Sequence, residues 1–176
     1  KLVVAFAPGS STDIVARLIA EQMQASIGQT VVVENKPGAG GNIATQQVMN
    51  APADGYTLLF HSVAYSVNPS LFANAGYDAL TDLQPVAMAA VTPNLVYVHP
   101  DVKANNLAEL LALARGGKMA YASSGNGTTT HLGAELLNHP IHGAESARRN
   151  RDGELPALER RGHLEEDPRV VGAVVA

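Results

Sequence analysis

Two clusters of small polar residues stand directly before predicted helices, an arrangement that can hold an anion. One lies at residues 9–13 and the other at residues 123–129, and each follows a short apolar run. The first N–H groups of a helix lack intrahelical partners and lie at the positive end of its dipole, so such a turn offers donors to a carboxylate or phosphate. Serine and threonine hydroxyls add donors without bulk. The candidate anion-binding residues are therefore Gly9, Ser10, Ser11, Thr12, Asp13, Ser123, Ser124, Gly125, Asn126, Thr128 and Thr129.

Helix capping explains either turn without a ligand. Ser10, Ser11 and Thr12 are all suitable N-caps. Asp13 is stabilised by the helix dipole whether or not it contacts a ligand amine. Two turns of the same chemistry in one chain favour binding over capping alone.

His61 and Ser62 form a third candidate group, after the predicted strand Thr57–Phe60. His61 could act as a general base, with Ser62 or Ser123 assisting, but no acid lies at a motif spacing to orient it. A hydrogen-bond donor that lines a cleft is the favoured interpretation. His139 and the histidine three residues later have no carboxylates placed to complete a metal site, so no metal is predicted.

Missing motifs exclude several other chemistries. The run Gly38–Ile43 resembles the dinucleotide fingerprint G-x-G-x-x-G but ends in isoleucine, and neither glycine-rich loop continues into the Lys-Ser/Thr of a phosphate-binding loop. The chain has no G-x-S-x-G elbow and no cysteine. Its formal net charge of -4 means that the chain lacks the excess of basic residues that is typical of nucleic-acid-binding proteins. We therefore predict no cofactor and no nucleic-acid partner.

Alternating strands and helices must position these candidates. Short apolar runs predict buried strands at Leu2–Phe6, Val31–Val33 and Thr57–Phe60. Apolar residues at helical spacing over Ile14–Met23 predict a helix that Gly28 ends. This alternation predicts an α/β fold with a mostly parallel sheet, in which ligands bind outside the carboxyl ends of the strands.

Further elements follow along the chain, and a second strand–turn–helix unit like that of residues 2–27 is predicted at residues 119–138. Asn42 caps a helix through about Met49, and strands are expected at Pro85–Val91 and Leu95–Val98. A helix then covers Leu107–Arg115. The strand Met119–Tyr121 leads into the second polar turn and a helix that begins within residues 128–130.

The composition changes sharply near residue 139. Residues 1–138 hold 15 charged residues and all eight aromatics, whereas residues 139–176 hold 13 charged residues and no aromatic. In the second stretch, only Val170–Val175 is apolar enough for a strand. A step of this kind indicates a domain boundary, a linker or sequence of different origin.

Four ordered motifs resemble one family, the substrate-binding proteins of tripartite tricarboxylate transporters (Bug or TctC-like). The resemblance runs from Lys1 to about Asn138, and Asn68-Pro69, Tyr77-Asp78 and Leu107–Leu111 also fit it. The four motifs are Val3–Arg17 (VVAFAPGSSTDIVAR), Val31–Asn42 (VVVENKPGAGGN), Ala53–Leu59 (ADGYTLL) and Tyr121–Thr128 (YASSGNGT).

The resemblance implies a periplasmic receptor and not an enzyme. Members of the family have two α/β lobes of the type II periplasmic-binding-protein kind, joined by crossover strands. They close around small organic anions, commonly carboxylates, and deliver them to the membrane permease subunits of the transporter. On this pattern Ser10–Asp13 matches the anion turn of the first lobe, and Ser123–Thr129 matches the turn of the second. His61 and Ser62 match the cleft wall, where the family more often has small residues.

The implied domains are a first lobe at residues 1–98, with a crossover strand near 95–99, and the start of a second lobe at 99–138. Residues 139–176 would be a divergent charged tail, either disordered or non-native. We expect a chain truncated after about residue 138, with an incomplete second lobe and exposed apolar faces that favour association. Carboxylate binding would then be retained or lost. The alternatives are a non-functional remnant and an α/β enzyme acting on a small anionic substrate.

Overall fold

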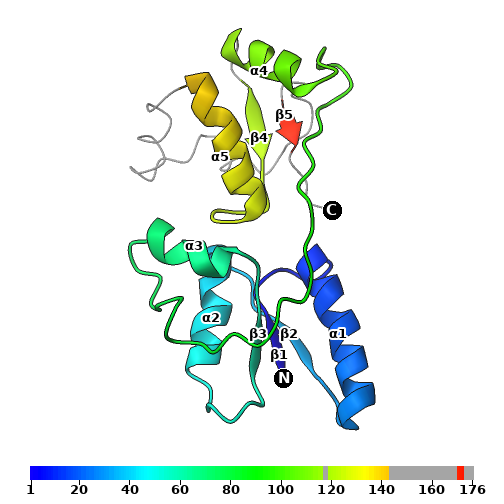
Figure 1. The fold of residues 1–176 in the computed structure, drawn as a ribbon, viewed down its shortest axis with the longest axis vertical. Helices are drawn as coiled ribbons and strands as arrows, with labels where there is room; N and C mark the ends of the chain where they lie inside the picture. Colours follow the sequence, from blue (N-terminus) through cyan, green and yellow to red (C-terminus); the bar gives the residue numbers. More distant parts are fainter. Residues whose placement is uncertain (117–118, 143–169, 173–176) are drawn as a thin grey trace. The chain divides into compact units, whose positions relative to one another are not determined.

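The computed structural model describes residues 1–116, 119–142 and 170–172, which fall into two compact units (Figure 1). Unit 1 comprises Lys1–Pro93 together with Gly125–Thr129. Unit 2 comprises Asn94–Ser124 and the described part of Thr130–Val175. Most of the predicted charged tail lies outside the described residues, and the expectation of disorder or non-native sequence there stays a prediction.

Unit 1 is built on a three-stranded parallel sheet with the strand order β2-β1-β3. This confirms the predicted parallel α/β arrangement. Because all three strands run in the same direction, their carboxyl ends lie at one edge of the sheet. The strands are β1 (Leu2–Val4), β2 (Val33–Asn35) and β3 (Leu58–Phe60).

The helices of unit 1 follow the strands in alternation. As predicted, Gly28 ends the first helix, because it adopts a left-handed φ of 66° and its N–H bonds the carbonyl of Gln24. A short 3-10 turn, η1, precedes the second helix. The elements are α1 (Ser11–Ile27), η1 (Ala39–Gly41), α2 (Asn42–Met49) and α3 (Ala64–Leu71).

The core of unit 1 occupies both faces of β1, since successive side chains of a strand point to opposite sides. One face packs against α1 and the other against α2. Small alanines on the helices allow close packing on the sheet, which holds each helix start near the strand ends. The buried members are Leu2, Val4, Ala16 and Ala20 on one face, and Val3, Ala5, Ala44 and Val48 on the other.

The helix α3 is absent from the sequence predictions because it contains Pro69. Proline has no N–H, so the carbonyl of Tyr65 loses its intrahelical donor. The hydroxyl of Tyr77 donates to this carbonyl at 2.8 Å, and the two tyrosine rings stack with centroids 5.0 Å apart. A contact twelve residues away in the sequence thus compensates for the proline.

Unit 2 contains a two-stranded parallel sheet in which Tyr121 pairs with Val171. The helix α5 crosses the predicted boundary at residue 139 and continues to His142. The second strand of the sheet falls within the predicted strand Val170–Val175. The elements are α4 (Leu107–Gly116), β4 (Ala120–Ala122), α5 (Thr129–His142) and β5 (Val170–Gly172).

The strands predicted at Pro85–Val91 and Leu95–Val98 are wrong, and so is the predicted crossover strand near residues 95–99. Apart from an isolated bridge at Asn94, this stretch forms no strand within the described part of the chain. Val86 and Met88 are each 82% exposed. An apolar run becomes a strand only where a neighbouring strand accepts its hydrogen bonds, and the described residues supply none here.

Within residues 1–116, 119–142 and 170–172, no helix combines the length and the apolar character that crossing a membrane requires.

Candidate functional site

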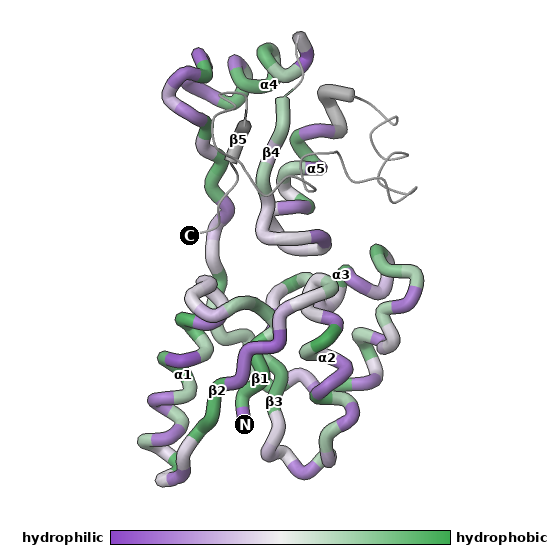
Figure 2. Tube along the Cα trace, turned by 180° about the vertical axis from the view of Figure 1, so that it is seen from behind, coloured by the Kyte–Doolittle hydropathy of each residue, from purple (hydrophilic) through white to green (hydrophobic). Residues whose placement is uncertain are grey.

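The carboxyl edge of the unit 1 sheet brings three loops together. Residues 5–10 follow β1, residues 36–41 follow β2 and residues 61–63 follow β3. Figure 2 shows β2 changing from hydrophobic to hydrophilic along its course toward this edge. The first polar turn, His61 and Ser62 therefore share one edge of one sheet, as parallel pairing requires.

The first polar turn has the geometry of an open helix N-terminus. Ser10 is the N-cap of α1, and its hydroxyl accepts the N–H of Asp13 at 3.2 Å. Gly9 adopts a φ of 81°, which a residue with a Cβ rarely takes. In the described part of the chain, no hydrogen bond occupies the backbone N–H of Ser11 or Thr12. These two donors, at the positive end of a 17-residue helix, are available to an anion.

Asp13 shapes this turn from within. One carboxylate oxygen, Oδ2, accepts the N–H of Gly9 at 2.8 Å and the Nε–H of Arg17 at 3.0 Å. The other, Oδ1, accepts the amide of Asn35 at 2.8 Å. The hydrogen bond from Arg17 holds the pKa of Asp13 down to about 2, so the carboxylate is charged across the physiological range. Of the two predicted roles of Asp13, helix capping and turn stabilisation account for its contacts without a ligand amine.

Asn35 and Arg17 complete the support of the turn, and the sequence analysis missed both. Asn35 receives a hydrogen bond from Arg17 Nη2 at 3.0 Å and donates to the carbonyl of Phe6 at 3.0 Å. Asn35 thereby ties the end of β2 to the loop after β1. The spacing of Asp13 and Arg17, four residues apart on a helix, was a usable signal. No local pattern pointed to Asn35.

His61 is held as a packed, neutral ring. Its Nδ1 lies 2.9 Å from the backbone nitrogen and 3.1 Å from the carbonyl oxygen of Ser62. The ring meets Phe6 and Tyr65 edge to face, with centroid distances of 5.5 and 6.0 Å. Burial lowers the pKa of His61, so the imidazole is uncharged at neutral pH.

The geometry of His61 and Ser62 does not form a nucleophile–base pair. The hydroxyl of Ser62 accepts the N–H of Ala64 at 3.3 Å, and His61 contacts the backbone of Ser62 and not its hydroxyl. The other ring nitrogen, Nε2, is buried with no hydrogen-bond partner among the described residues. The enzyme alternative therefore gains no support at this position.

A left-handed turn follows β2 at the same edge. Four successive residues, Gly38–Gly41, have positive φ values of 128°, 48°, 64° and 98°. The carbonyl of Gly40 accepts the side-chain amide of Asn68 at 2.9 Å. A Cβ on Gly41 would overlap the ring of His61. The glycine-rich run was visible in the sequence as a loop, but Asn68 was not predicted as part of this site.

The second polar turn connects β4 to α5. The hydroxyl and the N–H of Ser124 lie 2.8 and 3.1 Å from the hydroxyl oxygen of Thr130. The hydroxyl of Thr128 donates to the carbonyl of Gly125 at 2.6 Å. These groups fix the course of the turn, while Asn126 and Thr129 are exposed. The remaining candidate in this turn, Ser123, is partly buried next to β4.

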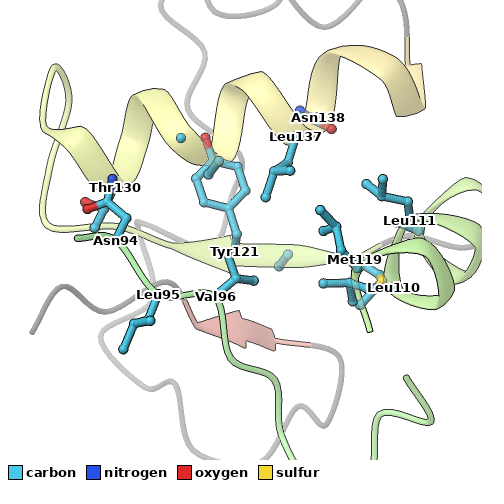
Figure 3. A pocket seen from close by; sticks show the side chains of 15 residues that line it. Asn94, Leu95, Val96, Leu110, Leu111, Met119, Tyr121, Thr130, Leu137 and Asn138 are labelled. Carbon is cyan, nitrogen blue, oxygen red and sulfur yellow. The ribbon is translucent and has the colours of Figure 1, made fainter. Parts of the chain in front are cut away.

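Unit 2 also contains an apolar groove of about 210 Å³ (Figure 3). The figure shows Tyr121 of β4 beside α5 in the middle of the lining, with Leu110 and Leu111 at one end and Asn94 and Thr130 at the other. None of the described residues that line the groove is charged, and most of them are apolar. The lining residues are Asn94, Leu95, Val96, Leu107, Leu110, Leu111, Ala114, Met119, Ala120, Tyr121, Thr130, Gly133, Ala134, Leu137 and Asn138.

Among the described residues, no group of three histidine or acidic side chains comes close enough to hold a metal ion. The imidazoles of His139 and His142 lie outside the described side chains.

Comparison with known proteins gives a consistent set of matches. The sequence model of the tripartite tricarboxylate transporter family receptors (TctC) matches residues 15–158. This match extends twenty residues beyond the composition change at residue 139. The protein BugT of Bordetella pertussis is 41% identical over 141 residues, which cover 78% of this chain and 43% of BugT.

Two solved structures share the fold. The protein Rpa4515 of R. palustris, solved with adipate, has a TM-score of 0.73 and 38% identity over 78% of this chain and 47% of its own. The periplasmic binding protein BugD has a TM-score of 0.68 and 35% identity over 86% of this chain and 55% of its own. The chain thus spans about half the length of the relatives that it matches.

Proposed function

Because this chain belongs to the tripartite tricarboxylate transporter receptor family, we propose that it carries the carboxylate-binding turns of a periplasmic solute-binding protein. The proposed ligand is a small organic dicarboxylate. The family consists of receptors and not of enzymes, and its matched members include periplasmic binding proteins. Delivery of the ligand to membrane permease subunits, and a periplasmic location for this chain, are parts of the same proposal.

The observation that carries the proposal is the open N-terminus of α1. Ser11 and Thr12 present unoccupied N–H groups, and the internal bonds of Asp13 hold the turn in place before any ligand arrives. A preorganised donor pair loses little entropy on binding and suits one carboxylate group. Adipate, which is bound in the structure of Rpa4515, has two such groups.

The second polar turn is the proposed partner for the other carboxylate of the ligand. Its candidate residues, Ser123–Thr129, have the same small polar character and also precede a helix. Their internal hydrogen bonds with Thr130 and Gly125 preform the turn in the way that Asp13 preforms the first. His61 is proposed to influence ligand choice through the shape of its packed ring.

Calorimetric titration with succinate, adipate and citrate tests the proposal. We expect binding of at least one of them to the folded chain. Ser11→Glu places a negative charge beside the open N–H groups. The Kd should rise at least tenfold, because the new carboxylate competes for these N–H groups and repels the carboxylate of the ligand. Gln24→Glu, at the other end of the same helix, adds the same charge as a control and should change Kd less than twofold.

Two outcomes would contradict the proposal. If the folded chain binds none of the three anions, then carboxylate capture by this chain is wrong and a non-functional remnant is favoured. If Ser11→Glu and Gln24→Glu weaken binding equally, then the first turn is not the anion site and the effect is one of net charge.

A further inference from the structure

The side chain of Asn68 lies buried on α3, and in the described part of the chain its Nδ2 makes hydrogen bonds while its Oδ1 makes none. It is 0% exposed. Its Nδ2 donates to the carbonyl of Gly40 at 2.9 Å and to Oδ1 of Asn42 at 2.7 Å. Because a backbone carbonyl can only accept, these contacts determine which way the amide points. Its Oδ1 is buried and has no hydrogen-bond partner in the described part of the chain. Such an atom is costly and calls for an explanation.

Two glycines bring backbone against this amide where no side chain would fit. A Cβ on Gly40 would lie 3.2 Å from Nδ2 of Asn68 and 2.9 Å from the carbonyl oxygen of Asn126. A Cβ on Gly127 would overlap Oδ1 of Asn68. Both glycines have positive φ, 64° and 80°. Gly125–Thr129 groups with unit 1, so these contacts lie within one compact unit.

Both of these backbone segments belong to turns at the candidate site. The segment on the Nδ2 side is the left-handed turn Gly38–Gly41, which also packs under His61. The segment on the Oδ1 side is the second polar turn, whose residues are candidates for binding a carboxylate. The amide of Asn68 can donate to one turn and accept from the other at the same time, whereas a carboxylate cannot donate and a leucine can do neither.

We propose that Asn68 is a positioning residue of the carboxylate site, which holds the Gly38–Gly41 turn through Nδ2 and receives the backbone N–H of Gly127 on Oδ1 when ligand binds. The ligand-binding part of this statement rests on the proposed function above. The buried Oδ1 is then a preformed acceptor, and ordering of the second polar turn is linked to satisfaction of this atom. Asn68 itself does not touch the ligand.

The first test measures amide hydrogen exchange in the full chain. Asn68→Ala should speed exchange at least tenfold at Gly40 in the free chain and at Gly127 in the presence of adipate, while the amides of the turn at residues 9–13 change less than twofold. Tyr65→Phe, on the same helix, also removes a buried polar atom without a partner among the described residues, and it should leave exchange at both glycines unchanged. The readout at Gly40 needs no ligand.

The second test keeps Asn68 and blocks the approach of its partner. Gly127→Ala should raise the Kd for adipate at least tenfold. Gly55→Ala is the matched control, because Gly55 has nearly the same φ, 82°, but open space around its Cβ position. The Gly55→Ala variant therefore has nearly the same backbone strain as Gly127→Ala, but it should change the Kd less than twofold. In the wild-type chain, adipate should increase protection of the Gly127 amide.

The outcomes separate this inference from the proposed function. If no carboxylate binds the wild-type chain but Asn68→Ala still speeds exchange at Gly40, the proposed function fails and the role of Asn68 in holding the Gly38–Gly41 turn stands. If the chain binds adipate while exchange at Gly127 is the same in wild type and Asn68→Ala, the positioning role is overturned. Equal Kd values for Gly127→Ala and Gly55→Ala would overturn it as well.

Discussion

The same local pattern, a strand followed by a small polar turn and a helix, occurs twice in the chain, but its strand is surrounded differently in unit 1 and in unit 2. In unit 1, β1 lies between two neighbouring strands, and Val3 and Val4 are fully buried. In unit 2, Ala114 is the buried apolar residue of the described set, Leu107 is 49% exposed, and an apolar groove lies open beside β4. The comparison shows that a local pattern can place a turn, while packing on both sides of its strand determines how firmly the turn is held.

The largest expected effect comes from breaking the support of the unit 1 turn at Asp13. Asp13→Ala leaves the N–H of Gly9, the guanidinium of Arg17 and the amide of Asn35 without their acceptor. We expect a loss of about 3 kcal/mol in the free energy of unfolding, measured by urea denaturation.

The control for this variant is Asp54→Ala. Asp54 is exposed and accepts a single N–H, from Tyr56 at 2.9 Å. Its removal should cost less than about 1 kcal/mol. Equal losses in the two variants would mean that the Asp13 network does not stabilise unit 1.

The lowered pKa of Asp13 also predicts how the stability of unit 1 changes at low pH. The hydrogen bond from Arg17 lowers its folded pKa to about 2, below the ordinary aspartate value. A depressed folded pKa contributes stability that is present above about pH 4 and is lost as the pH falls toward 2. Asp13→Asn should lack this part of the acid transition in a denaturation series.

Glu34 has to be separated from this effect, because Lys36 and Lys1 hold its pKa at about 2 as well. Glu34 is more exposed, and its ion pairs are screened by solvent and salt. We therefore expect Glu34→Gln to keep most of the acid transition that Asp13→Asn removes. The reverse order would show that the surface pairs, and not the turn, cause the acid sensitivity.

A smaller effect is expected from crowding the turn under His61. Gly41→Ala combines a φ of 98° with an overlap on the ring, and should lower the free energy of unfolding by about 2–3 kcal/mol. Gly28→Ala has a φ of 66° and open space, so it should cost about 1 kcal/mol. If adding His61→Ala to Gly41→Ala recovers nothing, then the overlap is not the cause.

In unit 2, one substitution is expected to increase stability instead of lowering it. Gly133 lies inside α5, and among the described residues a Cβ there would meet Asn94 Nδ2 at an ordinary distance of 3.7 Å. Gly133→Ala should stabilise the helix by about 0.5–1 kcal/mol, seen as slower amide exchange in α5. The amides of α1 should not change, and a parallel slowing there would mean that the two units do not respond separately.

The smallest expected effect concerns Ala39, the one residue other than glycine with positive φ among those described, at 48°. Ala39→Gly relieves the left-handed strain but makes the unfolded chain more flexible. The net gain should be about 0.5 kcal/mol by urea denaturation. A loss of stability would mean that the methyl group of Ala39 makes a packing contact worth more than the strain.

The outcome of the sequence predictions depended on the range of the interactions involved. The strands around Leu2–Val4 and Leu58–Phe60 and the helix ended by Gly28 were predicted, because apolar runs and glycine stops act over a few residues. The predicted strand Pro85–Val91 was wrong, because pairing requires a neighbour that the run itself does not encode. The missed α3 depends on Tyr77, which compensates for Pro69.

The candidate site divides in the same way. Its two polar turns, and the family to which the chain belongs, could be recognised from ordered sequence motifs. The residues that hold the turns could not. Asn35 is 22 residues from Asp13, and Asn68 is 28 residues from Gly40, so no local spacing connects them.

By itself, the sequence determined where helices start and stop and which loops present small polar groups, because caps, glycines and apolar periodicity act through neighbouring residues. The tertiary structure alone decided that both oxygens of Asp13 are used within the protein, that His61 is a packed neutral ring, and that Asn68 keeps a buried acceptor. These properties depend on which distant groups are brought into hydrogen-bond range and on which atoms lose their contact with water. Only the folded chain specifies both.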